Sequence, residues 1–167
     1  MQTHPKLMIR RAPWSNPVGR DLRAAQQAEL DARYGDTTHE PGSAPSAADL
    51  AIFLIAYERS TGQPLGCGGL RWVAPTTAEV KRVYVLPYAR GAGIASSILT
   101  ALEAEAHTSG ITLVLAEAGS AQPDGKMFYE SAGYRRIPNF GPYQELDESL
   151  CYGKPVMNPV RVHAVAG

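Results

Sequence analysis

The clearest chemical signal in the sequence is a glycine-containing loop, Pro87–Ala95, which joins an apolar strand pattern to a helical one. The first N–H groups of a helix are unpaired and carry a partial positive charge, so a helix start is a site for phosphate. Gly91 and Gly93 allow positive φ angles and let an anion approach closely. Arg90 adds a formal charge, and Ala92 and Ala95 keep the approach narrow. The loop is therefore predicted to bind a phosphate group.

Two other interpretations of this loop are open. It could be a turn that only connects a strand to a helix. It could also be a dinucleotide fingerprint, because Glu117 follows at about the distance of a ribose-binding acid. Three features argue against a dinucleotide: four residues separate the strand from Gly91, Ser96 stands where the third glycine would be, and only one βαβ unit is present.

The elements that must position this loop follow from the spacing of apolar and turn-forming residues. Their order is β, α, three β, α, β, α, β, β, which predicts an α/β domain with mixed strand directions. Strict alternation along Glu79–Leu86 places Glu79, Lys81, Val83 and Val85 on one face and Val80, Arg82, Tyr84 and Leu86 on the other. The predicted strands are Leu7–Arg11, Ala51–Tyr57, Leu65–Val73, Glu79–Leu86, Ile111–Ala116, Tyr134–Ile137 and Leu150–Tyr152; the helices are Asp21–Tyr34, a helix starting at Ile94, and Asp124–Ala132, with Asp124 as its cap.

Composition narrows the functional class. With 167 residues, the chain is expected to form one domain, and its formal net charge of zero argues against a nucleic-acid or anionic-membrane partner. No apolar run is long enough to cross a bilayer and the first residues lack a signal peptide, so a cytoplasmic location is expected. Cys67 and Cys151 are expected to be buried thiols. The four His residues show no ligand spacing, so no metal site is predicted.

Two stretches resemble the GNAT superfamily of acetyl-CoA-dependent N-acetyltransferases. Residues 79–95 are similar to its cofactor motif, Gln/Arg-x-x-Gly-x-Gly/Ala after the fourth strand, whose glycines fall on Gly91 and Gly93. Phe128–Tyr134 is similar to the Tyr-x-x-x-Gly-Phe/Tyr ending of the family's last helix. The resemblance covers roughly Ala51–Pro155. The chain departs from the motif at its first position, where Tyr88 replaces Gln or Arg.

The resemblance implies a fold and a cofactor site. The fold is a mixed central sheet of six to seven strands flanked by helices and splayed between the fourth and fifth strands. Acetyl-CoA is the implied co-substrate, with no metal. Its pantetheine arm would pair with the backbone of Val83, Tyr84 and Val85, and Gln122 would lie near that arm. Its pyrophosphate would rest on Arg90, Gly91, Ala92, Gly93, Ile94 and Ala95, with Ser96 or Ser97 as further donors.

The implied chemistry is direct acetyl transfer to a primary amine, and a small-molecule acceptor is predicted over a protein. Deprotonating a lysine-like amine at neutral pH costs about 4–5 kcal/mol, so a base helps. Glu79 matches the family position of that base, but it could instead orient the acceptor or pair with Lys81 or Arg82. Tyr129 is the predicted acid for the leaving thiolate. The alternative function is a non-catalytic acyl-CoA-binding regulatory module on the same fold.

The sequence leaves the acceptor unidentified. Its pocket is expected to form from Asp21–Tyr34, the loop that follows, and Pro138–Glu148, where aromatic and acidic side chains occur. The acids Asp36, Glu40, Glu145, Asp147 and Glu148 could attract a cation or simply be solvated. The expected domain spans residues 1–157 and is followed by a tail at 158–167, with a strand at Val160–Val165 as the other interpretation of that end. A homodimer is compatible with the family.

Overall fold

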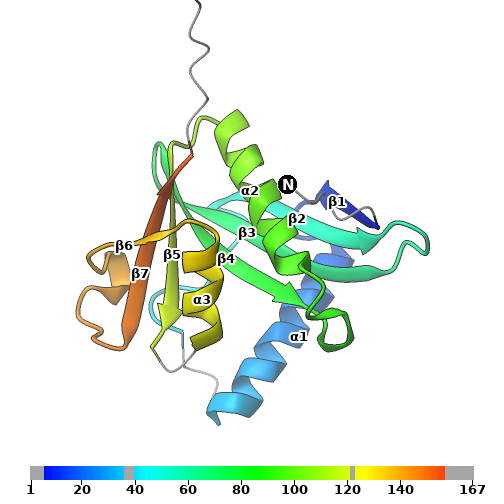
Figure 1. Ribbon diagram of the computed structural model, residues 1–167, viewed down its shortest axis with the longest axis horizontal. Coiled ribbons are helices and arrows are strands. Elements are labelled where there is room, and N and C mark those ends of the chain that lie inside the picture. The colour runs from blue at the N-terminus through cyan, green and yellow to red at the C-terminus, as the bar shows by residue number, and fades with distance from the viewer. Residues whose placement is uncertain (1–5, 36–39, 121–122, 157–167) are drawn as a thin grey trace, which may run out of the picture.

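The computed structural model describes residues 6–35, 40–120 and 123–156, which form a seven-stranded sheet with helices on both faces (Figure 1). The strands lie in the order β1-β2-β3-β4-β5-β7-β6. The element order is the predicted one, with two added 3-10 turns. The strands are β1 Leu7–Arg11, β2 Leu50–Glu58, β3 Pro64–Ala74, β4 Thr77–Val85, β5 Leu113–Gly119, β6 Arg135–Arg136 and β7 Ser149–Pro155; the helices are α1 Pro17–Tyr34, α2 Ile94–Thr108 and α3 Pro123–Ser131; the 3-10 turns are η1 Pro87–Ala89 and η2 Gly141–Tyr143.

The helices divide between the two faces of the sheet. In Figure 1, α2 and α3 cover one face while α1 lies behind the other. The larger apolar core joins Ile98, Leu99 and Leu102 of α2 to inward side chains of the sheet. A smaller core joins Leu22 of α1 to Phe53 and neighbouring sheet residues. Apolar burial on both faces holds the sheet at a fixed position relative to the helix starts.

Three of the predicted boundaries differ from the structure, and local capping explains the first. Helix α1 begins at Pro17 rather than Asp21, because the Asn16 side chain accepts hydrogen bonds from Val18 N and Gly19 N, and proline fits a first helical turn. Asp124 lies within the first turn of α3 rather than at its cap. Strand β5 begins at Leu113 and runs past Ala116, so Glu117 lies inside the strand instead of ending it.

Strands β4 and β5 are the parallel neighbours in the sheet, and they separate partway along their length. Their pairing runs from Thr77↔Leu113 to Glu79↔Leu115 and goes no further. Beyond Glu79, β4 pairs only with β3, on its other side. The predicted splay between the fourth and fifth strands is therefore confirmed, and it leaves one edge of the second half of β4 open.

A β-bulge at Arg82 overturns the predicted alternation along β4. Arg82 has φ +60, and the β3–β4 register shifts between Cys67 and Gly69. Val80 packs in the same core as Val83 and Val85, under α2, whereas Tyr84 packs under α1. One extra residue in a bulge shifts every later side chain to the opposite face. Strict alternation therefore assigned the residues after Arg82 to the wrong faces relative to Glu79.

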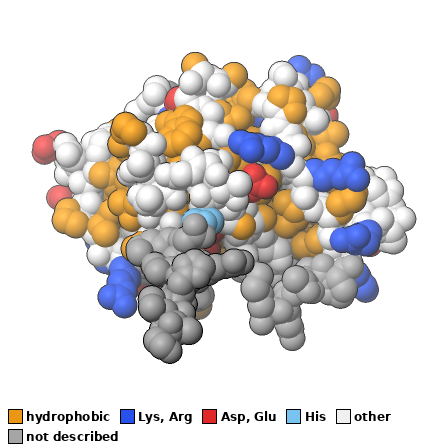
Figure 2. Space-filling view, turned by 90° about the horizontal axis from the view of Figure 1, so that it is seen from above, with side chains coloured by type: hydrophobic (Ala, Val, Ile, Leu, Met, Phe, Trp, Pro, Cys, Tyr) orange, Lys and Arg blue, Asp and Glu red, His pale blue; other side chains and the backbone are white. Residues whose placement is uncertain are grey.

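Other predictions have mixed outcomes. Cys67 and Cys151 are buried and unbridged, as expected. Among the described residues, no helix is long and apolar enough to span a membrane. On the face shown in Figure 2, most Lys and Arg side chains lie on the right of the view, separated by apolar, uncharged and acidic surface. Gln122 and residues 157–167 lie outside the described residues, and the domain limits, the homodimer and the cytoplasmic location stay predictions.

Candidate functional site

The splay opens into a cavity of about 920 Å³ between β4 and β5. Its walls come from α1, the segment before β2, the splayed strands β4 and β5, the start of α2, α3, and the segment around η2. Residues from the segments predicted to form an acceptor pocket, Asp21–Tyr34 and Pro138–Glu148 among them, therefore line one cavity. Its polar and aromatic lining includes Gln26, Glu40, Glu79, Lys81, Arg82, Glu117, Tyr129 and Tyr143.

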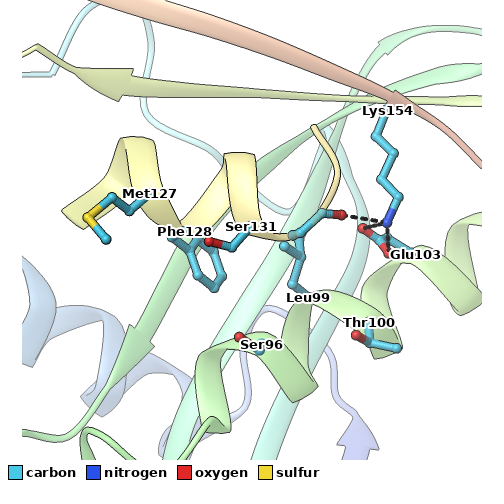
Figure 3. Close-up of a pocket in the computed structure, with 9 residues that line it drawn as sticks. Ser96, Leu99, Thr100, Glu103, Met127, Phe128, Ser131 and Lys154 are labelled. Carbon is cyan, nitrogen blue, oxygen red and sulfur yellow. Dashed lines mark hydrogen bonds and ion pairs between the residues drawn. The ribbon is translucent and has the colours of Figure 1, made fainter. Parts of the chain in front are cut away.

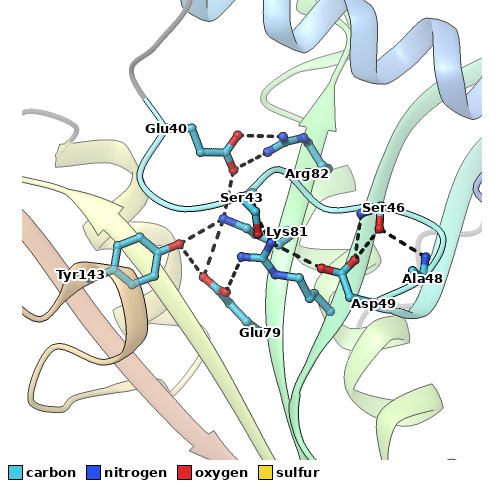
Figure 4. A network of polar contacts seen from close by, with 10 residues as sticks. Glu40, Ser43, Ser46, Ala48, Asp49, Glu79, Lys81, Arg82 and Tyr143 are labelled. Atoms are coloured by element: carbon cyan, nitrogen blue, oxygen red, sulfur yellow. Dashed lines mark hydrogen bonds and ion pairs between the residues drawn. The ribbon is translucent and has the colours of Figure 1, made fainter.

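Glu79 lies at the closed end of the splay and is buried, with 2% of its surface exposed (Figure 4). One carboxylate oxygen accepts a hydrogen bond from Tyr143 Oη at 2.7 Å and lies 3.8 Å from Lys81 Nζ. The other accepts from Arg71 Nη2 at 3.4 Å. Of the two predicted pairing partners, Lys81 lies beside Glu79, whereas Arg82 pairs with Glu40 instead. Both oxygens of Glu79 are thus engaged by donors.

The bulge brings two consecutive cations onto one carboxylate. Arg82 donates two hydrogen bonds to Glu40, at 2.8 and 2.7 Å, and Lys81 donates one at 3.0 Å (Figure 4). Burial alone would raise the pKa of Glu40, but the bonds from Arg82 and the charge of Lys81 outweigh it and lower the pKa to about 2. Glu40 therefore ties the segment before β2 to the bulge, so its charge is already matched within the protein.

Tyr129 projects from α3 into the core and also lines the cavity. Its ring packs against Tyr134 and Tyr152, with centroid separations of 5.4 and 6.0 Å. Burial, followed by the nearby charges of Glu117 and Glu79, raises the pKa of its phenol. The hydroxyl therefore stays protonated across the working pH range and can act as a hydrogen-bond donor.

Glu117 extends from β5 and lines the same cavity. Burial raises the pKa of its carboxyl above the ordinary value, and the Ser149 side chain, which hydrogen-bonds to it, acts in the opposite direction. No ion pair to Glu117 occurs within residues 6–35, 40–120 and 123–156. A half-buried carboxyl with a raised pKa and no ion-pair partner among these residues takes up a proton more readily than a solvated one.

The open edge of β4 is partly satisfied by side chains. Gln26 Nε2 donates to the carbonyl of Val83 at 3.0 Å, and Arg90 Nε donates to the carbonyl of Val85 at 2.9 Å. Arg90 also pairs with Glu29 of α1 at 2.8 Å. The Arg90 side chain is therefore held between β4 and α1, and Tyr84, the third predicted backbone position, places its ring in the core under α1.

The predicted phosphate loop has the expected backbone. Gly91 and Gly93 have φ +82 and +76, and the Cβ that either lacks would meet no atom within 4 Å. Gly93 is the N-cap of α2, and no side chain caps the helix there. The first N–H groups of the helix, which begin at Ile94, thus have no side-chain acceptor. The Ser97 hydroxyl donates a hydrogen bond to the carbonyl of Gly93 at 3.1 Å. Tyr88, at the departure from the family motif, is 74% exposed.

A second cavity, of about 480 Å³, lies between α2 and α3 (Figure 3). Ser96 and Thr100 of α2 face Met127 and Phe128 of α3 across it. At its far side Lys154 Nζ donates to Glu103 at 2.9 Å and to the carbonyl of Ala132 at 2.8 Å. The exposed hydroxyl of Ser96 thus links the start of α2 to this cavity.

Sequence reasoning missed several residues that surround the site. No sequence pattern singled out Arg71, which faces Glu79 across the β3–β4 pair; counting back from the turn at Pro75 locates it. The spacing pointed to Glu117 only as a ribose-binding acid, and Tyr143 lies in the predicted aromatic and acidic segment Pro138–Glu148. Gln26 carried no signal, because its contact with Val83 spans 57 positions of the chain.

Comparisons with known proteins agree with this geometry. A family model described as an acetyltransferase (GNAT) domain matches residues 49–136. An IAA acetyltransferase from Azospirillum brasilense is 36% identical in an alignment that covers 77% of this chain and 86% of that protein. Among solved structures, a protein from Klebsiella pneumoniae assigned as an acyl-CoA N-acyltransferase gives a TM-score of 0.73 at 28% identity, covering 90% of this chain and 97% of that one. A GNAT family acetyltransferase from Elizabethkingia anophelis, solved with acetyl-CoA bound, shares the fold with a TM-score of 0.65 at 15% identity, covering 90% and 99%.

Proposed function

This chain belongs to the GNAT acetyltransferase family and is an acyltransferase, and we propose that it transfers an acetyl group from acetyl-CoA directly to a primary amine of a small molecule. The observation that carries the proposal is the cavity at the splay, which has Tyr129 on one wall. The uncapped start of α2 follows β4 after one short turn. A donor held along β4 would therefore have its phosphates at α2 and its acyl group in the cavity.

Backbone groups would hold the donor. The N–H groups at the start of α2 would receive the pyrophosphate, because Gly91 and Gly93 leave the approach open. Ser96 would add a hydroxyl, with the α2–α3 cavity beside it. The open edge of Val83–Val85 would receive the amide-bearing arm as an added strand. The arm would use the N–H groups of this edge, since Gln26 and Arg90 already occupy two of its carbonyls.

Two side chains would act on the transfer. Tyr129 would donate a hydrogen bond to the departing sulfur, and the raised pKa of its phenol favours this over complete proton transfer. Of the two roles predicted for Glu79, base or orienting group, the bonds from Tyr143 and Arg71 support the orienting role. Bound acetyl-CoA supplies the activated thioester, and the chain supplies position and donors.

The acceptor site favours a small molecule over a protein chain. Its walls come from both α1 and the segment around η2, which close the cavity on two sides. Glu40 is already paired with Lys81 and Arg82, so it is not available to attract a cation. Glu145, Asp147 and Glu148 line the cavity and are exposed, so they would meet a cationic amine first.

A thiol-release screen over amine classes tests this proposal. IAA, the acceptor named for the Azospirillum relative, belongs in the same panel. Turnover with an amine supports the proposal, while acetyl-CoA binding measured by calorimetry without turnover on any acceptor favours a non-catalytic module. Tyr129→Phe should lower kcat by roughly 10²-fold or more while changing acetyl-CoA affinity little. An unchanged kcat would remove Tyr129 from the mechanism.

A further inference from the structure

We propose that Glu117 is the catalytic residue that accepts the proton of the acceptor ammonium group, either directly or through one water. The inference rests on the proposed N-acetyl transfer and names a group that the family motifs do not identify in this chain. It follows from comparing the two carboxylates that line the cavity, Glu79 and Glu117.

Glu79 is poorly placed to take a proton. Its Oε2 accepts a 2.7 Å hydrogen bond from Tyr143, and that hydroxyl in turn accepts one from Lys81 at 3.0 Å. Its Oε1 faces Arg71. Tyr143, Lys81 and Arg71 thus already surround both oxygens of Glu79, and these contacts lie on the buried side of the cavity wall. Glu79 therefore serves as a positioning residue that holds Tyr143 and Lys81.

Glu117 occupies the open side of the same wall. The β4–β5 pairing ends at Glu79↔Leu115, so Glu117 lies two residues beyond the last pair, where the strands have separated. Its neighbours Ala116 and Ala118 belong to the core under α2 and α3. Because side chains alternate along a strand, Glu117 projects from the opposite face, which Glu79 and Lys81 share with η2. The carboxyl thus faces the space into which an acceptor would enter.

The groups around Glu117 suit proton exchange. Burial has the largest effect and raises the pKa of its carboxyl; the Ser149 hydrogen bond and the charge of Lys81 lower it, and the charges of Glu79 and Glu40 raise it. The net effect is to raise the pKa of the Glu117 carboxyl toward the pH range in which a general base is most effective. Tyr129 and Tyr143 also feel the Glu117 charge, as does the Cys151 thiol on the paired strand β7.

The proton balance is simple. The acceptor ammonium gives one proton to the Glu117 carboxylate, and the neutral nitrogen then attacks the thioester carbonyl carbon. The carbon–nitrogen bond forms, the carbon–sulfur bond breaks, and the nitrogen releases its second proton. The departing sulfur takes up one proton, with the Tyr129 hydroxyl donating a hydrogen bond to it. One net proton leaves to solvent when Glu117 ionises again.

The pH dependence of kcat/KM separates this role from a structural one. When KM is expressed as the total amine concentration, kcat/KM of the wild-type enzyme should vary little with pH between the pKa of Glu117 and the pKa of the amine. In Glu117→Gln, kcat/KM should fall at least 100-fold near neutral pH. It should then rise about tenfold per pH unit, because only amine that is already neutral can react. Glu117→Asp should restore part of the flat profile. Glu79→Gln is the matched variant at the competing carboxylate, and it should keep the wild-type profile shape even where its rate is lower.

A second measurement does not depend on turnover. The measurement is NMR of protein labelled with ¹³C at the glutamate carboxyl carbons. The Glu117 resonance is identified as the one missing from Glu117→Gln, and its pKa should lie above the ordinary glutamate value. Titration at or below that value would overturn the proposal, as would a Glu117→Gln enzyme with an unchanged pH profile. A Glu117→Gln profile that rises with pH while the wild-type profile stays flat, combined with upward titration of the Glu117 carboxyl, supports it. If wild type releases no thiol with any acceptor, the proposed transfer itself fails, and the carboxyl titration still decides whether Glu117 is poised as a base.

Discussion

The hydrogen bond from Tyr143 to Glu79 gives the sharpest stability prediction. Tyr143 is 1% exposed and Glu79 2%, and the O···O distance is 2.7 Å. A hydrogen bond to a charged group contributes about 1.5–3 kcal/mol, and a buried carboxylate that loses its donor regains no water. Tyr143→Phe removes only the hydroxyl, so the ring packing against Phe140 should be kept. We expect the free energy of unfolding to fall by about 2 kcal/mol.

Urea denaturation and calorimetry measure this loss, which for a chain of this size corresponds to a Tm decrease of roughly 4–8 °C. Tyr84→Phe is the matched control, because its hydroxyl bonds to Glu29 at 3.2 Å near the surface, where we expect a loss below about 1 kcal/mol. Combining Tyr143→Phe with Glu79→Gln should give less than the sum of the single losses. Equal losses in the two Tyr→Phe variants, or full additivity in the cycle, would refute the reasoning.

Two further predictions concern the segment before β2 and the packing of β3. Because the folded pKa of Glu40 is about 2, against an ordinary 4.5, its ion pairs add stability above pH 4.5 that is lost as pH falls toward 2. In Glu40→Gln, unfolding free energy should vary less with pH in that window, and an unchanged slope would contradict the assignment. Gly68→Ala should cost roughly 1–3 kcal/mol, because the new Cβ would lie 2.7 Å from Ile98 Cγ2. Gly153→Ala, whose Cβ would be no closer than 3.5 Å to any atom, should cost less in the same urea series, and the reverse order would rule out overpacking at β3.

The Glu40 contacts also explain why the bulge matters to the site. A non-glycine residue at φ +60 costs on the order of 1 kcal/mol, so the conformation of Arg82 must be held by its surroundings. Two hydrogen bonds from Arg82 to Glu40 hold it there. The same bulge turns Val83 toward α2 and Tyr84 toward α1. The conformation of Arg82 thus determines both the cavity wall proposed to contact the acceptor amine and the β4 edge proposed to bind acetyl-CoA.

The sequence by itself determined the features that depend on local patterns. Glycines at 91 and 93 before an apolar helix predicted a positive-φ turn at a helix start, and the periodicities predicted the element order of an α/β domain. Only the tertiary structure decided which charges meet. Glu79 pairs with Arg71 because β3 and β4 are adjacent, and Glu40 reaches Arg82 across 42 positions because a bulge redirects that side chain. Glu117 lines the cavity because β5 leaves β4 just before it. Ionic and proton-transfer roles depend on distances between distant segments and on burial, and local sequence patterns specify neither.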